Sequence, residues 1–173
     1  MFSTREAGVA ILFRPDLDIE IKTTECDDNG RLLRAHAVID GSDLNLVNVY
    51  APSGQTQIQE RKDFFASLNS YIVTSKPFFN VLAGDFNCII NPRLDSSHRT
   101  QTSDSSSKVL QSFIRTTDLT DIYRLYHPDT KAFTFISQHA SCRRLDRFYV
   151  DANRVNQVLK ADIELCESQR TCF

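Results

Sequence analysis

The sequence Val81-Leu82-Ala83-Gly84-Asp85-Phe86-Asn87 joins an apolar run to a glycine, a carboxylate and a carboxamide. Because side chains alternate along an extended strand, we expect Asp85 and Asn87 on one side and Phe86 on the other. Gly84 lets a phosphate or another backbone approach closely, or marks a bulge. The same residues also suit an ordinary turn after a strand, so this spacing alone leaves a reactive site and a plain turn equally open.

A second stretch, Leu44-Asn45-Leu46-Val47-Asn48-Val49-Tyr50, has the same form, an apolar strand that ends in polar side chains. Asn48 and Tyr50 are two residues apart, so they share a face of the strand. Pro52 and Gly54 predict a turn directly after it. A lone tyrosine at a strand end often only places its hydroxyl in solvent, but two strands with this ending predict one shared polar site.

Length and element order predict a single α/β domain over residues 1–173. The apolar run 7–13 predicts a buried central strand, and Asn29-Gly30 predicts a hairpin. Thr56-x-x-Gln59 predicts a capping box at the start of a helix. In all, we expect strands at 7–13, 19–24, 32–39, 44–50, 81–87, 133–136, 144–150 and 158–165, helices at 56–75 and around 109–114, and a long surface loop at 91–107.

Composition is that of an ordinary globular protein, with 41% hydrophobic residues, 24% charged residues and a net charge of −2. This balance gives no overall attraction for nucleic acid, so any contact with DNA must come from a local patch. The best candidate is Arg143-Arg144-x-x-Arg147, which either binds phosphate or forms a solvated strand edge.

The five cysteines include no CxxC pair, which argues against a zinc site and a disulfide framework and favours a reducing compartment. No apolar run reaches the roughly 18 residues of a membrane span, and the first residues do not resemble a signal peptide. The sequence therefore predicts a soluble, intracellular protein without a membrane partner.

Three ordered motifs resemble the endonuclease/exonuclease/phosphatase superfamily: Asn48-Val49-Tyr50-Ala51-Pro52-Ser53, Gly84-Asp85-Phe86-Asn87 and Arg144-Leu145-Asp146-Arg147-Phe148. Three further stretches are similar to the apurinic-type endonuclease domain of LINE-type non-LTR retrotransposons: Asn91-Pro92-x-Leu94-Asp95, Asp121-Ile122-Tyr123-Arg124-x-x-His127-Pro128 and Phe133-Thr134-Phe135. The resemblance extends from about Gly8 to about Leu165.

This resemblance implies a DNase I-like, four-layer α/β sandwich, in which helices flank two packed mixed β-sheets. It also implies a phosphodiesterase that uses Mg²⁺ or Mn²⁺ to nick DNA. In intact relatives the same polyprotein carries a reverse transcriptase, and the site of action would be the nucleus.

The resemblance also assigns roles to single residues. Asp85 orients or deprotonates the attacking water, Asn87 helps to hold the phosphate, and both contact the metal. Tyr50 hydrogen-bonds the phosphate or the leaving group. Asp146 orients a catalytic histidine, although it could also simply pair with a neighbouring arginine. The residues implied to contact phosphate or DNA are Asn48, Ser53, Arg144 and Arg147.

The chain departs from this family in two ways. Relatives carry a metal-binding glutamate before the equivalent of Gly8 and a Ser-Asp-His motif after the last strand, and neither is found here. The four histidines, His36, His98, His127 and His139, do not stand where the motif needs one. We therefore expect a truncated domain that cleaves DNA weakly or not at all. The alternatives are a non-catalytic remnant that binds nucleic acid weakly, and a phosphatase or sphingomyelinase of the same superfamily.

Overall fold

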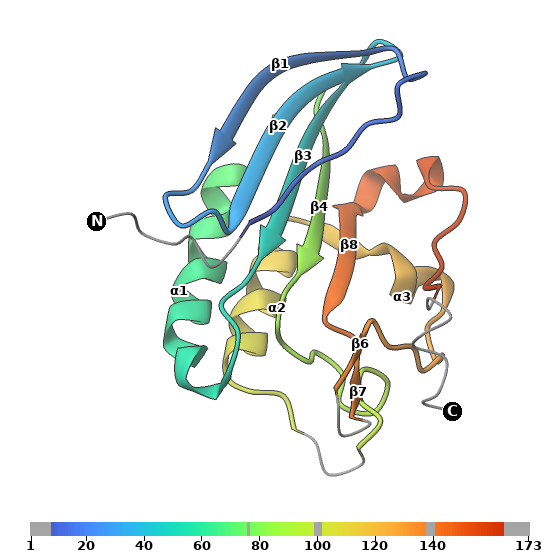
Figure 1. Cartoon of the computed structure of the whole chain (residues 1–173). Helices are drawn as coiled ribbons and strands as arrows, with labels where there is room; N and C mark the ends of the chain where they lie inside the picture. The colour runs from blue at the N-terminus through green and yellow to red at the C-terminus, as the bar shows by residue number, and fades with distance from the viewer. Residues whose placement is uncertain (1–7, 76, 99–101, 138–140, 165–173) are drawn as a thin grey trace.

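The computed structural model of this protein describes residues 8–75, 77–98, 102–137 and 141–164. In these residues a six-stranded mixed sheet has the order β1-β2-β3-β4-β8-β5, and β6 and β7 form a second, two-stranded sheet (Figure 1). The strands are β1 (Ile19–Cys26), β2 (Leu32–Ile39), β3 (Ser42–Tyr50), β4 (Phe79–Asp85), β5 (Leu119–Asp121), β6 (Phe135–Ile136), β7 (Cys142–Arg143) and β8 (Asp146–Asp151). The helices are α1 (Ile58–Ser67), α2 (Ser106–Thr116) and α3 (Ile122–Tyr126), with 3-10 helices at Gln55–Gln57, Leu68–Tyr71 and Ala152–Gln157.

Tight turns connect the first three strands. Asp27 accepts the N–H groups of Arg31 and Leu32 at 2.6 and 2.8 Å, and Gly30 has a φ of 69°. The hairpin predicted from Asn29-Gly30 is therefore confirmed as the β1–β2 connection. β3 then pairs with β4 in parallel, and α1 lies in the crossover between them.

The helices α1 and α2 cover one face of the sheet (Figure 1). A single apolar cluster joins helices and sheet, and its members include Val47, Val49, Phe65, Leu68, Leu82, Phe86, Leu110, Phe113 and Tyr149. The side-chain alternation expected before Asp85 is confirmed, because Leu82 and Phe86 are both buried in this cluster. The alternate side chains of β4 therefore project from the opposite face of the sheet.

The segment 8–18 runs across that opposite face without joining the sheet (Figure 1). The prediction of a buried central strand at 7–13 is wrong for residues 8–13, where Leu12 is 92% exposed. Strands β2, β3 and β4 already have neighbours on both sides, so this apolar segment finds no ladder partner among them. It is held instead by a side chain, because Asn48 donates to the carbonyl oxygen of Ala10 at 2.8 Å.

An apolar cavity of about 610 Å³ lies on this same face, between β4, β8 and the segment 158–164. Phe79, Val81 and Val150 line it together with Phe148, which is 58% exposed. The strand predicted at 158–165 is wrong over 158–164, where the chain has no regular structure. The physical reason is that β8 is already paired on both edges, with β4 and β5.

The helix predicted at 56–75 is shorter in the structure, because the chain tightens into a 3-10 helix after α1. The predicted capping box is also wrong: Thr56 lies in a 3-10 turn, and the N-cap of α1 is Gln57 without a side-chain bond. At the start of α2, Asp104 accepts the N–H of Ser106 at 2.8 Å, which is the bond expected of a capping carboxylate.

The predicted α/β class is thus confirmed, with a mixed sheet that carries helices and a smaller second sheet. In the part of the chain that the structure describes, no helix is both long and apolar enough to span a membrane.

Candidate active site

Three of the predicted catalytic side chains lie in one row across three strands. Tyr50 on β3 is the direct partner of Asp85 on β4, and Asp85 is the direct partner of Asp146 on β8. Directly opposed residues project to the same face of a sheet. The row lies at the end of the sheet toward which β3 and β4 run and at which β8 begins (Figure 1).

Asn87 reaches the same place by a turn instead of by strand alternation. β4 ends at Asp85, and Asn87 has a φ of 48°, a left-handed conformation that asparagine tolerates better than most residues. Its backbone N–H donates to Asp85 Oδ1 at 2.8 Å, and its Nδ2 donates to the carbonyl oxygen of Ala51 at 2.8 Å. The turn interpretation of this motif is therefore confirmed, and the turn itself sets Asn87 against Asp85, while the site interpretation stays a prediction.

Gly84 is required by the neighbouring strand. Its φ is 131°, and an added Cβ atom would lie 2.0 Å from the carbonyl oxygen of Val49. Of the roles considered from sequence, the close approach of another backbone is the one the structure has.

The electrostatic surroundings of Asp85 shift its proton affinity. Burial raises the pKa of Asp85 to about 6, and the charge of Asp146 acts in the same direction. The hydrogen bond from the Asn87 N–H and the charge of Arg147 act against this rise. A carboxyl group with this pKa exchanges a proton near neutral pH, which is the range useful for general acid or base chemistry.

The raised pKa of Asp85 predicts that the protein loses stability as the pH rises from about 4 to about 6. In this range the unfolded chain has already released the proton that the folded chain still holds, so folding is favoured at the lower pH. After solvent screening is allowed for, we expect a contribution of about 1–2 kcal/mol to the free energy of unfolding.

The measurement is urea unfolding at pH 5 and pH 7.5 in EDTA, with Asp85→Asn compared with the wild type. We expect Asp85→Asn to be the more stable protein at pH 7.5 and to lose less stability between the two pH values. The exposed Asp129→Asn serves as the control and should keep the wild-type pH dependence. Identical pH dependence in all three proteins would contradict the role of Asp85.

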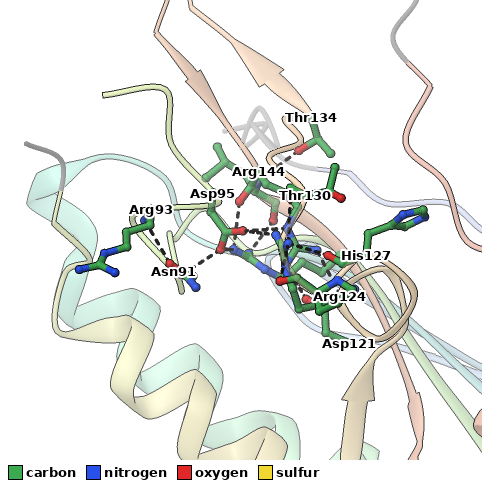
Figure 2. A network of polar contacts seen from close by, with 12 residues as sticks. Asn91, Arg93, Asp95, Asp121, Arg124, His127, Thr130, Thr134 and Arg144 are labelled. Carbon is green, nitrogen blue, oxygen red and sulfur yellow. Dashed lines mark hydrogen bonds and ion pairs between the residues drawn. The ribbon is translucent and has the colours of Figure 1, made fainter. Parts of the chain in front are cut away.

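Arg144 and Arg147, which the resemblance assigned to DNA, are each only 2% exposed. Arg144 donates to Asp95 Oδ1 through Nε at 3.0 Å and to Asp121 Oδ2 through Nη2 at 2.5 Å (Figure 2). Arg147 donates to Asp95 Oδ2 at 3.2 Å. Both guanidinium groups are occupied inside the protein, so they form neither a DNA-facing patch nor a solvated strand edge, and Asp146 is not the carboxylate with which they pair.

Asp95 is the common partner in this buried network (Figure 2). Its carboxylate is 1% exposed and also accepts from Arg124 Nη2 at 3.0 Å and from the Asn91 N–H at 2.9 Å. Burial alone would raise the pKa of Asp95, but the charges of Arg147 and Arg144 outweigh it and hold this pKa below its usual value. Sequence reasoning missed this role, because an aspartate in a polar loop is also a common turn former.

The other predicted phosphate contacts differ in availability. Asn48 uses its amide to hold Ala10, whereas Ser53 is exposed in the loop after β3. Arg143, which the resemblance did not single out, lines a cavity of about 240 Å³ together with Asn87. Another cation missed from sequence is Arg31, whose guanidinium lies 5.6 Å from the centre of the Tyr50 ring.

A divalent metal needs oxygen donors that lie close together. In the described ranges, no group of three or more His, Cys, Asp or Glu side chains is placed to hold a metal ion. Asp85, Asp146 and the carboxamide of Asn87 still offer oxygen atoms at one end of the sheet. Mg²⁺ commonly uses one or two carboxylates and completes its shell with water, so this set fits Mg²⁺ or Mn²⁺ in an open site.

Two of the histidines have partners away from the row. His36 Nε2 lies 2.7 Å from Asp43 Oδ1, and His127 Nε2 lies 3.0 Å from Asp162 Oδ1. His98 is exposed in the loop after Asp95, and His139 lies outside the described residues.

No protein-family model matches the chain. The chain is 33% identical over 162 residues to the "Transposon TX1 uncharacterized 149 kDa protein" of Xenopus laevis, a match that covers 91% of this chain and 12% of that protein. The fold is similar to that of AP endonuclease LMAP from Leishmania major, with a TM-score of 0.63 and 22% identity over 75% of this chain and 48% of that one. It is also similar to humanized D. rerio TDP2, with a TM-score of 0.51 and 17% identity over 77% of this chain and 52% of that one.

The chain thus spans about one eighth of the length of the transposon protein and about half of each solved structure. Both solved structures belong to the superfamily that the motifs resemble. The chain has the fold of the endonuclease/exonuclease/phosphatase superfamily, and its sequence is related to that of a transposon protein.

Proposed function

We propose that this chain is part of a divalent-metal-dependent phosphodiesterase that nicks DNA. The observation that carries the proposal is the row Tyr50–Asp85–Asp146, with Asn87 turned against Asp85, at one open end of a sheet with this superfamily's fold. The similarity to a transposon protein supports DNA as the substrate. A reverse transcriptase in the same polypeptide and action in the nucleus would accompany this function.

The row suits hydrolysis of a phosphodiester. Asp85, with a pKa of about 6, accepts the proton of the attacking water while the water oxygen bonds to phosphorus and the bond to the leaving oxygen breaks. Tyr50 donates a hydrogen bond to the phosphate or to the leaving oxygen. In a complete site, Asp146 would orient a histidine that binds the phosphate. When bound by Asp85 and Asn87, Mg²⁺ or Mn²⁺ would neutralise charge on the phosphate.

Contacts with DNA come from groups at the rim of this row. Ser53 is exposed in the loop after β3, and Arg143 shares a cavity with Asn87. Their donors would hold the phosphate backbone, which supplies most of the affinity for DNA. We assign Arg144 and Arg147 to the interior and not to this surface.

We also propose that the chain alone is a slow nuclease. By resemblance, a complete site adds a metal-binding glutamate and a histidine beside Asp146. Among the described residues, no group of three or more His, Cys, Asp or Glu side chains could hold a metal ion, and His36 and His127 have other partners. Catalytic groups that act as a unit lose most of their effect when one is missing.

The test is nicking of supercoiled plasmid in Mg²⁺ or Mn²⁺ by the chain, by Asp85→Ala, and by a longer polypeptide that carries the glutamate and the Ser-Asp-His motif. We expect slow nicking by the chain, a loss of about 10²-fold or more in Asp85→Ala, and fast nicking by the longer protein. The exposed Asp129→Asn is the control and should nick at the wild-type rate.

Each outcome decides between the candidate functions. If the chain nicks DNA fast and Asp85→Ala abolishes the nicking, the proposal of a slow nuclease is refuted and the proposal of a phosphodiesterase is supported. Nicking that survives Asp85→Ala would refute the assigned row. If neither the chain nor the longer protein nicks DNA, the nuclease function is refuted, and the non-catalytic remnant and the phosphatase or sphingomyelinase remain as the alternatives.

A further inference from the structure

Asp95, the buried carboxylate at the centre of the arginine network, bonds residues both before and after Asp146 in the sequence. Arg144 precedes Asp146 by two residues and Arg147 follows it directly. Arg144 Nε donates to Asp95 Oδ1 at 3.0 Å, and Arg147 Nη2 donates to Asp95 Oδ2 at 3.2 Å. In addition, the Arg144 backbone N–H donates to the Asp95 carbonyl oxygen at 3.0 Å. One loop residue thus holds the strand on both sides of Asp146.

The side chain of Arg147 also bonds the backbone just before Asp146. Its Nη2 donates to the carbonyl oxygen of Arg144 at 3.0 Å, and its Nη1 donates to the carbonyl oxygen of Leu145 at 3.1 Å. The Leu145 carbonyl oxygen also accepts the N–H of Phe86 at 3.0 Å. Phe86 stands between Asp85 and Asn87, so this carbonyl connects the β8 start to the other half of the row.

We propose that Asp95 is a positioning residue, which fixes Asp146 relative to Asp85 by holding the guanidinium groups of Arg144 and Arg147. Its role in activity rests on the proposed function, but the geometry that it sets is a property of the fold and can be tested without activity. Three arginines converge on Asp95, from β8, from its start and from α3, and its carboxylate is itself almost fully buried. Such a carboxylate has no water to replace a lost partner.

Asp121 supplies a matched control in the same network. It binds the same guanidinium, because Arg144 Nη1 and Nη2 donate to its two carboxylate oxygens at 3.1 and 2.5 Å. The hydrogen bonds given to its side chain come from Arg144 and from the N–H of Arg124. Asp121→Asn therefore disturbs Arg144 while Arg147 keeps its bonds to Asp95 and to the carbonyl oxygen of Leu145.

The experiment compares Asp95→Asn and Asp121→Asn in the full chain by amide hydrogen exchange and by plasmid nicking. We expect exchange of the Phe86 and Asp146 N–H groups to accelerate at least tenfold in Asp95→Asn, relative to core amides of α2, and less than threefold in Asp121→Asn. In nicking, Asp95→Asn should lower kcat at least tenfold with less than a threefold change in KM. Asp121→Asn should change kcat less than threefold.

A second variant keeps the proposal testable if Asp95→Asn does not fold. Arg147→Lys keeps a positive charge beside Asp95 but cannot also bond the carbonyl oxygens of Arg144 and Leu145, so it should show the same exchange at Phe86 and Asp146. Equal exchange at these amides in the Asp95 and Asp121 variants would overturn the proposal, as would wild-type exchange in Arg147→Lys. If the wild-type chain does not nick DNA, the proposed function fails, and the exchange data still decide the positioning role.

Discussion

Gly84→Ala is expected to lower the free energy of unfolding by about 3 kcal/mol or more. Two costs add at this position. The φ of 131° is a conformation that residues with a side chain rarely adopt, and the new Cβ would lie 2.0 Å from the Val49 carbonyl oxygen. Because that atom is backbone, β3 and β4 must move apart where they carry Tyr50 and Asp85. Urea or thermal unfolding of the purified variant measures the loss.

Gly41 provides the control for Gly84. It also has a positive φ, of 74°, but nothing lies within 4 Å of an added Cβ, so Gly41→Ala carries the conformational cost without the clash. We expect Gly41→Ala to cost about 1 kcal/mol. A Gly84→Ala variant no less stable than Gly41→Ala would show that β3 and β4 tolerate the separation, and the close approach would then have no structural weight.

The sequence predicted those parts of the fold that depend on local pattern. The Asn29-Gly30 turn, the strands that lead to Tyr50 and Asp85, and the burial of Phe86 follow from turn chemistry and alternation. The run at 8–13 is apolar but not buried, because hydrophobicity alone specifies neither burial nor the strand that would supply hydrogen bonds. The strands β2, β3 and β4 each already have two neighbours, which is a property of the sheet topology.

The candidate site shows the same division. The motifs indicated which residues meet, and register brings Tyr50, Asp85 and Asp146 together. They did not show that Arg144 turns inward, because an arginine beside a possible site looks the same whether it meets a phosphate or a buried aspartate. Asp95 lies in a loop far from Arg144 in sequence, so only the fold pairs them.

Arg61→Met is expected to cost about 2–4 kcal/mol and to loosen the loop that carries Ser53. Arg61 is buried under this loop and bonds both of its ends, the carbonyl oxygen of Pro52 at 2.7 Å and that of Gly54 at 3.2 Å. It also bonds Asp104 Oδ2 at 2.7 Å. Methionine keeps much of the stem but leaves these acceptors without a donor.

The two substitutions at Arg61 separate charge from geometry. Arg61→Lys keeps the charge beside Asp104 but lacks the planar fork that reaches several acceptors, so we expect a smaller loss than in Arg61→Met with similar loosening of the loop. Arg115→Met, at an exposed position of α2, should change stability by no more than about 0.5 kcal/mol.

Hydrogen exchange of the loop amides at Ser53 and Gly54, read together with urea unfolding, measures both effects of Arg61. If both Arg61 variants unfold like the wild type, the buried arginine adds nothing to stability. If they are destabilised while the loop exchanges at the wild-type rate, Arg61 supports the core and not the rim of the site. If Arg61 holds the loop that carries Ser53, faster exchange should be confined to this loop. Arg61 would then position the loop after Tyr50, as Asp95 positions Asp146.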